Sequence, residues 1–283
     1  MSKVIITGDS TCDLSPDILK KLNIQTIPLY VNVGDDSFKD GVDITPDTIF
    51  QIFEERGILA KTSAIPIYDF QIFFKDLLDQ GFEIVHITLG SKFSTTYQCA
   101  VSAANLIDSD KISIVDSENL STGYGHVIMH GGELAMEDLS RTEIVNELKA
   151  LIPKVNASFI IDTLTYLWKG GRCSSVSALG ANLLQLKPCI EVIDGQMKVG
   201  KKYRGNLDRC LKSYVDDRLK DLSKINSNRI FITHTLQEDK IAEKVKERIE
   251  SKNYFKEIII TKAGCTISCH CGPNTLGILY VDQ

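Results

Sequence analysis

The sequence predicts an α/β protein of two domains: an N-terminal parallel-sheet α/β/α domain in residues 1–155 and a C-terminal mixed-sheet α/β domain in residues 156–283. The length of 283 residues suits two domains of ordinary size. In the first half, short apolar runs alternate with helical patterns, which is typical of a parallel sheet. In the second half, the apolar runs Cys189 to Ile193 and Met197 to Lys201 flank Asp194-Gly195, a strong hairpin signal. An antiparallel hairpin favours a second, different sheet.

The helices of the first domain are marked by their caps. Two helices are expected to begin at Pro16 and Pro46, because proline is favoured at the first helical position and each follows a typical N-cap residue, Ser15 or Thr45. Gly57 is expected to end the second helix. Ser140 and Glu143 form a capping box before a helix expected over Ile144 to Val155. Two more helices are expected, around Phe70 to Leu78 with a stop at Gly81, and from the turn at Gly90-Ser91 to Ile107. The strands of this domain are expected at Val4 to Thr7, Ile84 to Leu89 and Ile112 to Val115.

In the second domain, apolar runs and helical patterns again alternate after the boundary near residues 150 to 157. Besides the hairpin, strands are expected at Ser158 to Asp162, Ile230 to Thr233, Ile258 to Thr261 and Leu276 to Val281. Helices are expected around Leu207 to Leu222 and Ile241 to Ile249.

Composition argues against several classes of partner. The net charge of −5 gives no basic field for nucleic acid or an anionic membrane surface. No run of about 18 apolar residues predicts a membrane span. The first apolar run is too short for a signal peptide, so a cytoplasmic protein is expected, with its eight cysteines as thiols. The sequence contains no P-loop and no Gly-x-Gly-x-x-Gly motif, so nothing in it indicates a nucleotide site. It also lacks a complete Gly-x-Ser-x-Gly motif, which would indicate an acyl-transfer triad.

Two polar segments suit the binding of an anion. Lys61 to Pro66 reads as a loop before a helix, and Gly90 to Gln98 as the loop and helix start after a central strand. Hydroxyls and free amides at helix starts can hold a carboxylate, with Thr62 and Ser94 as donors. The alternative is simple helix capping.

Other polar residues carry weaker signals. Asp9 and Asp13 follow the first strand, where open α/β sheets bind ligands, although both carboxylates can instead bond backbone amides in a tight turn. Arg172 ends a glycine turn and can face a carboxylate or solvent. His126 and His130 have the i, i+4 spacing of metal ligands but fit a core or surface role better.

The segment Gly264 to Pro273 contains Cys265, Cys269, His270 and Cys271. Cysteine and histidine are zinc ligands, but structural zinc sites usually draw paired ligands from two separate segments. Three consecutive residues are poorly placed to hold one ion. A lone histidine beside a ligand pocket fits the segment better.

The residues match a known family at six places in order. These are Asp9 to Leu14, Lys61 to Pro66, Phe93 to Gln98, Leu164 to Arg172, Leu186 to Pro188 and Cys269 to Pro273. Together they resemble the DegV family of bacterial fatty-acid-binding proteins, over nearly the whole chain.

The resemblance implies one long-chain fatty acid held between the two domains, no cofactor and no catalysis by this chain. It implies that Thr62 and Ser94 hold the carboxylate, supported by Arg172 and His270. Thr95 is also expected at the carboxylate. It stands where the family usually has glycine, and its β-branched side chain is expected to limit φ and to crowd the amide beside the carboxylate. Some relatives present the fatty acid to a separate ATP-binding fatty acid kinase subunit, which implies a kinase contact at Arg204.

Two alternatives stay open at this stage. One is a serine-dependent lipid hydrolase that uses Ser10 or Ser94 with His270. The other is a zinc-binding module at Cys265 to Cys271.

Overall fold

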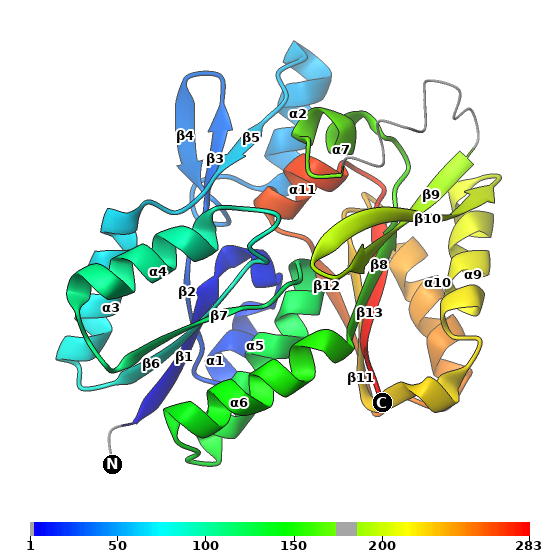
Figure 1. Ribbon diagram of the computed structural model, residues 1–283. Helices are drawn as coiled ribbons and strands as arrows, with labels where there is room; N and C mark the ends of the chain where they lie inside the picture. The colour runs from blue at the N-terminus through cyan, green and yellow to red at the C-terminus, as the bar shows by residue number, and fades with distance from the viewer. Residues whose placement is uncertain (1–2, 174–185) are drawn as a thin grey trace.

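The protein, described by a computed structural model over residues 3–173 and 186–283, is built around two main sheets (Figure 1). The four-stranded sheet contains β1 (Val4–Asp9), β2 (Gln25–Ile27), β6 (Glu83–Thr88) and β7 (Ile112–Asp116) in the order β2-β1-β6-β7. All its strand pairs are parallel. Its strands are apolar on both faces, as expected for a sheet covered on both sides.

The six-stranded sheet has the order β10-β9-β8-β13-β11-β12. Its strands are β8 (Val155–Ile160), β9 (Leu186–Ile193), β10 (Gln196–Arg204), β11 (Ile225–His234), β12 (Glu257–Lys262) and β13 (Leu276–Asp282). The sheet is mixed: β11 and β12 are parallel, whereas the other pairs are antiparallel. The predicted α/β class with one parallel and one mixed sheet is confirmed, and so is the hairpin at Asp194-Gly195.

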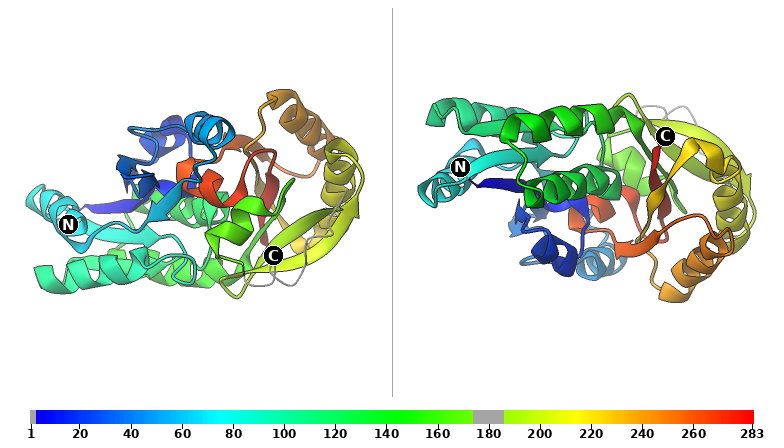
Figure 2. Two further views of the ribbon diagram at one scale, coloured as in Figure 1. Left: turned by 90° about the horizontal axis from the view of Figure 1, so that it is seen from above. Right: turned by 90° about the horizontal axis from the view of Figure 1, so that it is seen from below.

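Helices cover both sheets in layers (Figures 1 and 2). On the parallel sheet, α3 (Ile67–Asp79) and α4 (Thr96–Ile107) pack on one face, while α1 (Pro16–Lys21), α5 (Ser121–Met136) and α6 (Arg141–Leu151) share the core of the other. Helix α5 also contacts β8, β11 and β13, so it lies between the two sheets. The outer face of the mixed sheet is covered by α9 (Leu207–Arg218) and α10 (Asp239–Glu250).

Most helix limits follow from the caps in the sequence. Ser15 and Thr45 accept hydrogen bonds from backbone amides in the first turns of α1 and α2 (Pro46–Arg56), and Gly57 ends α2 with φ of 67°. The capping box of Ser140 and Glu143 is present. The predicted extension of α6 to residue 155 is wrong: the helix ends at Leu151, because Pro153 lacks the amide hydrogen that continues a helix.

A small third sheet is absent from the sequence prediction. It contains β3 (Tyr30–Val33), β4 (Asp36–Lys39) and β5 (Lys61–Ser63), in the antiparallel order β4-β3-β5. The interpretation of residues 61–63 as a loop is therefore wrong. Strands of three or four residues are too short to show a clear alternation of apolar and polar side chains.

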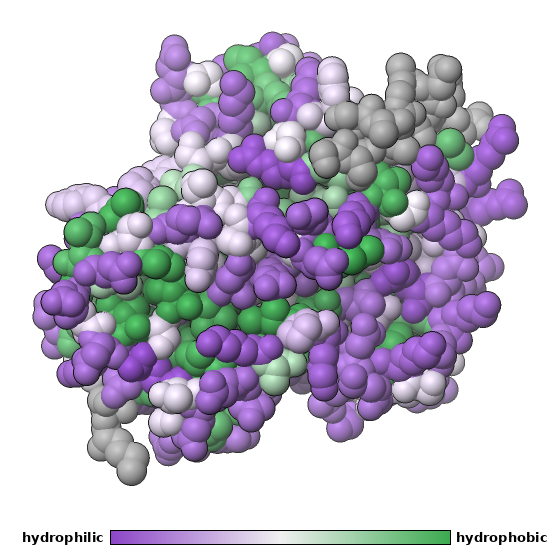
Figure 3. All heavy atoms as spheres, in the orientation of Figure 1, coloured by the Kyte–Doolittle hydropathy of each residue, from purple (hydrophilic) through white to green (hydrophobic). Residues whose placement is uncertain are grey.

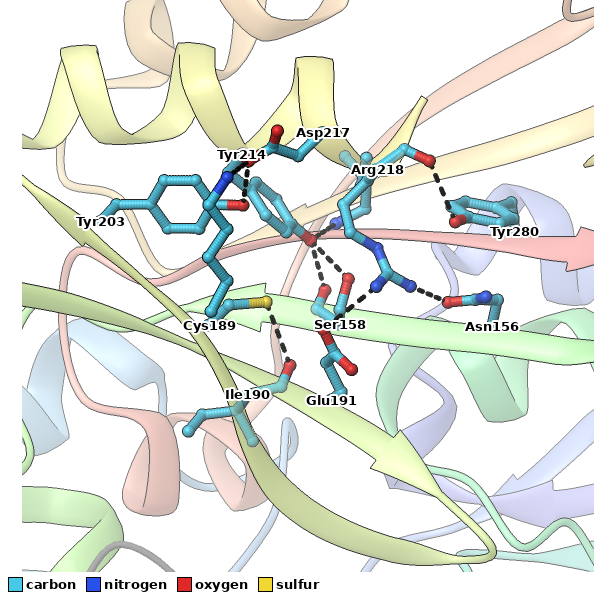
Figure 4. Close-up of polar contacts among 12 residues, drawn as sticks. Asn156, Ser158, Cys189, Ile190, Glu191, Tyr203, Tyr214, Asp217, Arg218 and Tyr280 are labelled. Carbon is cyan, nitrogen blue, oxygen red and sulfur yellow. Dashed lines mark hydrogen bonds and ion pairs between the residues drawn. The ribbon is translucent and has the colours of Figure 1, made fainter. Parts of the chain in front are cut away.

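Hydrogen bonds tie α9 to the mixed sheet (Figure 4). Tyr214 Oη donates to the carbonyl of Ser158 at 2.7 Å and accepts from the amide of Ile278 at 3.0 Å. Arg218 contacts Glu191 at 3.2 Å and also the amide oxygen of Asn156. These buried or half-buried polar groups fix α9 against β8, β9 and β13.

The two halves of the surface differ in hydropathy (Figure 3). The half with β9, β10 and α9 is mostly hydrophilic, whereas apolar residues show on the half with α3 and α4.

Among the described residues, no helix combines the length and the apolar character needed to cross a membrane.

His126 on α5 is buried between the two sheets. Its Nε2 lies 3.0 Å from the carbonyl oxygen of Leu279, and its ring lies edge-on to that of Phe231, with 4.8 Å between the ring centres. His126 therefore has a structural place between the two sheets, as the core role weighed from the sequence requires.

Candidate functional site

A cavity lies where the carboxyl ends of the parallel strands meet a helix from the end of the chain. Leu29 and Leu89, which follow β2 and β6, line it together with Phe93, Leu120 and Met197. The helix is α11 (Cys265–Cys271), which packs against α7 (Thr165–Gly170), α2, β3 and β5. The polar residues that line the cavity are Thr62, Ser94, Arg172, Thr266 and His270. Four of these were predicted from the sequence; Thr266 was not.

Thr62 and His270 meet across 208 positions of sequence. Thr62 Oγ1 on β5 lies 2.8 Å from His270 Nε2 on α11. Burial, with a smaller contribution from nearby Arg172, lowers the pKa of His270 to about 4, so the ring is neutral at pH 7. Nδ1 has no partner among the described residues. A buried lone pair without a partner is less costly than a buried N–H without one, so we assign the proton to Nε2.

This tautomer sets the role of Thr62. Nε2–H donates to Thr62 Oγ1, which leaves the threonine hydroxyl hydrogen available for an anion in the cavity. The backbone of α7 closes the other side of the ring: a Cβ on Gly170 would lie 2.4 Å from His270 Nδ1. Glycine at position 170 is therefore required for this position of the imidazole.

Ser94 lines the cavity and lies two residues before the first residue of α4. Its Oγ accepts from the amide of Thr96 at 3.2 Å and lies 2.9 Å from Thr96 Oγ1. Ser94 therefore bonds the first amide of α4 from outside the helix, whereas the N-cap itself is Thr95, which makes no side-chain capping bond. Thr95 is exposed and is not among the lining residues. Its φ of −77° is ordinary for a β-branched residue, so no glycine is needed there.

The two predicted arginines lie in different places. Arg172 lines the cavity and bridges two segments: Nη1 donates to the carbonyl of Gly170 at 2.7 Å, and Nε to that of Phe93 at 3.4 Å. Arg204 is the exposed last residue of β10 and is not among the lining residues. The structure therefore brings Arg172 to the cavity but not Arg204.

Three buried carboxylates lie near the cavity, and two of them, Asp13 and Asp40, hold the start of α11 in place. Asp13 accepts from the amide of Gly264 at 2.8 Å, and Asp40 accepts from those of Cys265 at 2.8 Å and Thr266 at 3.2 Å. Asp9 accepts from the amides of Thr11 at 3.1 Å and Leu89 at 2.7 Å, the backbone role weighed from the sequence. Burial raises the pKa of Asp9 to about 6 and that of Asp13 to about 8.

The cysteines of α11 occupy apolar surroundings. Cys265 and Cys269 pack with Val31, Ile44 and Ile49, whereas Cys271 belongs to the core beneath α3 and α4. Burial raises the pKa of Cys269 and Cys271 to about 12, which disfavours the thiolate that binds a metal. The described residues contain no group of three acidic, cysteine or histidine side chains placed to hold a metal ion. The arrangement does not favour the zinc-binding alternative.

The hydrolase alternative needs a serine hydrogen-bonded to His270. Ser10 Oγ instead donates to Asp40 at 3.0 Å and accepts from the amide of Leu29 at 3.1 Å. Ser94 pairs with Thr96, and His270 Nε2 pairs with Thr62. No contact between His270 and either serine is found among the described residues, so the arrangement does not favour a nucleophilic serine.

The cavity is small for an organic ligand. Among the described residues its volume is about 50 Å³, compared with about 300–1,000 Å³ for typical small-molecule sites. A large apolar core adjoins it, since Leu29, Leu89, Phe93, Leu120 and Met197 belong to the same cluster as Phe70 and Phe74 of α3. A long apolar ligand can enter only if these side chains move apart.

Comparison with known proteins agrees with this architecture. The model of the family described as DegV, an uncharacterised protein family, matches residues 3–283. DegV domain-containing proteins from Clostridium acetobutylicum and Caldanaerobacter subterraneus subsp. tengcongensis are 34% identical over 284 residues and 31% identical over 283 residues, with all of each chain covered.

Solved structures are also similar. A DegV family protein from Thermus thermophilus, described as fatty acid binding, has a TM-score of 0.91 at 24% identity, covering 99% of this chain and 100% of that one. A stearic acid-binding protein from Eubacterium ventriosum has a TM-score of 0.86 at 26% identity, covering 100% and 98%. A match of the family model over nearly the whole chain, with full-length relatives above 30% identity, places this protein in a family: the chain belongs to the DegV family.

Proposed function

We propose that this protein binds one long-chain fatty acid in a pocket between its two domains, with the carboxylate at Thr62, Ser94, Arg172 and His270. The observation that carries the proposal is a cavity lined by five polar residues that adjoins a large apolar cluster. Structures at 26% identity, from Eubacterium ventriosum and Thermotoga maritima, are described as binding stearic acid and as having a fatty acid binding function.

The free energy of binding is expected to come mainly from the acyl chain. Each buried methylene contributes about 0.8 kcal/mol, so about 14 of them give roughly 11 kcal/mol before the costs of association. Separating the side chains around the small cavity adds to those costs. A charge-assisted hydrogen bond contributes about 1.5–3 kcal/mol, so the polar residues mainly fix the orientation of the head group.

Native mass spectrometry of the purified protein tests this function. We expect an adduct with the mass of one fatty acid per chain, and delipidated protein is expected to regain it on incubation with oleate. A co-purified ligand of another class, or failure of the delipidated protein to take up oleate, would overturn the proposal.

The finer role we propose is presentation of the carboxylate to a separate ATP-binding fatty acid kinase subunit, which phosphorylates it in a cytoplasmic reaction. Arg204 is our candidate for the kinase contact, because it is an exposed cation at the end of β10. No catalytic group of this chain is needed, since the kinase subunit supplies the ATP site.

Replacing both Thr62 and Ser94 with alanine is expected to reduce acyl-phosphate formation with a cognate kinase by more than tenfold, while oleate affinity falls less. The reason is that these hydroxyls orient the carboxylate, whereas the acyl chain supplies most of the affinity. Because Ser94 also bonds the first amide of α4, Thr45→Ala is the matched control: it removes a hydroxyl that bonds an amide at the start of α2 and does not line the cavity. Unchanged acyl-phosphate formation in the double variant would contradict the assigned roles.

A further inference from the structure

The hydroxyl of Thr266 has no partner at a place where one is expected. Thr266 is 3% exposed and lines the cavity. Its Oγ1 is buried and, among the described residues, has no hydrogen-bond partner. Burying a hydroxyl without a partner costs about 1–3 kcal/mol, whereas valine has nearly the same shape and no such cost. A ligand in the cavity accounts for a hydroxyl at this position.

The position of Thr266 is fixed by the first turn of α11. Its backbone amide donates to Asp40 Oδ2 at 3.2 Å, and the preceding amide donates to Asp40 Oδ1 at 2.8 Å. His270 follows four residues later, so both side chains lie on one face of the helix, the face that lines the cavity. The hydroxyl is thus held in place without using its own hydrogen.

The other hydroxyls beside the cavity already have partners. Thr62 Oγ1 pairs with His270 Nε2, and Ser94 Oγ accepts from the amide of Thr96 and pairs with Thr96 Oγ1. A carboxylate offers about four lone-pair positions on its two oxygens, which two such hydroxyls do not fill. A further hydroxyl donor on α11 can bond one of the remaining positions.

We propose that Thr266 is a further ligand of the fatty acid head group, with its Oγ1–H donating to the carboxylate. This inference rests on the proposed function and adds a residue of α11 to those already assigned. The C-terminal half then supplies two residues to the head-group site, the hydroxyl of Thr266 and the imidazole of His270. A donor aimed at a charged oxygen also favours a free carboxylate over an ester, because a hydrogen bond to an ionised acceptor is about twice as strong as one to a neutral acceptor.

The test compares Thr266→Val, which keeps the shape and the branched Cβ, with Thr266→Ser, which keeps the hydroxyl. Both are measured after delipidation, by titration with oleate and with methyl oleate. We expect Thr266→Val to raise the Kd for oleate about tenfold and that for methyl oleate about threefold or less. Thr266→Ser is expected to stay within about threefold of the wild type for both.

Three outcomes decide against the inference in different ways. Oleate binding by Thr266→Val at the wild-type Kd would overturn the role of Thr266 while leaving the proposed function intact. An equal loss for oleate and methyl oleate would show a role in packing and not in carboxylate recognition. Failure of the wild-type protein to bind oleate would overturn the proposed function, and this inference with it. Urea unfolding of each variant checks that the fold is retained.

Discussion

Replacing Asp40 with alanine is expected to lower the free energy of unfolding by about 5 kcal/mol. The buried carboxylate accepts from the amides of Cys265 and Thr266 and from Ser10 Oγ, at 2.8, 3.2 and 3.0 Å. Alanine leaves two backbone amides and a hydroxyl without this partner in a site that water scarcely reaches. Each lost hydrogen bond to a charged group costs about 1.5–3 kcal/mol. The loss of all three therefore costs more than the about 0.5–3 kcal/mol of an ordinary substitution.

Equilibrium urea unfolding at pH 7 measures this loss, and oleate affinity is expected to fall with it, because Asp40 fixes the helix that carries His270. Asp43→Ala is the matched control: it removes the same charge three residues later, where the exposed carboxylate accepts only from the amide of Lys39 among the described residues. The control is expected to lose less than about 1 kcal/mol. Equal losses in the two variants would show that Asp40 does not hold α11.

Asp40 also shows why part of the site could not be predicted from the sequence. The carboxylate and the amide of Cys265 are separated by 225 positions, and neither segment carries a pattern that indicates the other. Thr266 has a different, local reason: the cysteines and histidine are the prominent signals of Gly264 to Pro273, and the segment shows no pattern that predicts its helix. Once the helix is known, the i, i+4 spacing from Thr266 to His270 identifies the shared face.

The fold was easier to predict, because its strongest signals are local. Ser15, Thr45 and the pair Ser140 and Glu143 act within one helical turn, so their effect can be read directly. The β3, β4 and β5 strands are held by pairing with one another and not by their own patterns. Thr62 lies beside the cavity although its segment is a strand and not the expected loop, because its hydroxyl and the family resemblance point to the residue independently of its secondary structure.

A second large effect is expected at His86, a buried histidine of β6 in the core beneath α3. Its Nδ1 lies 2.9 Å from Thr7 Oγ1, and the rings of Phe70 and Phe74 lie 5.2 Å from its own. Nε2 is buried and has no partner among the described residues. Burial lowers the pKa of His86 to about 3, compared with 6.5 for an exposed histidine.

The sign of the pH effect follows from this shift. As the pH falls below 6.5, the unfolded chain takes up a proton at residue 86, while the folded protein does not until about pH 3. Stability is therefore lost on acidification, by about 2 kcal/mol between pH 7 and pH 5 from this one residue. The raised pKa values of Asp9 and Asp13 act in the opposite direction, but they are common to the wild type and a His86 variant and cancel in the difference.

His86→Leu is therefore expected to lose about 2 kcal/mol less than the wild type between pH 7 and pH 5, measured by urea unfolding at both pH values. Leucine also removes the partner of Thr7, which changes stability equally at the two pH values. Thr7→Val supplies the control, since it removes the same hydrogen bond and keeps the imidazole, so its pH dependence is expected to match that of the wild type. If His86→Leu kept the wild-type pH dependence, the histidine would be protonated within the folded core, and burial would not be excluding its charge.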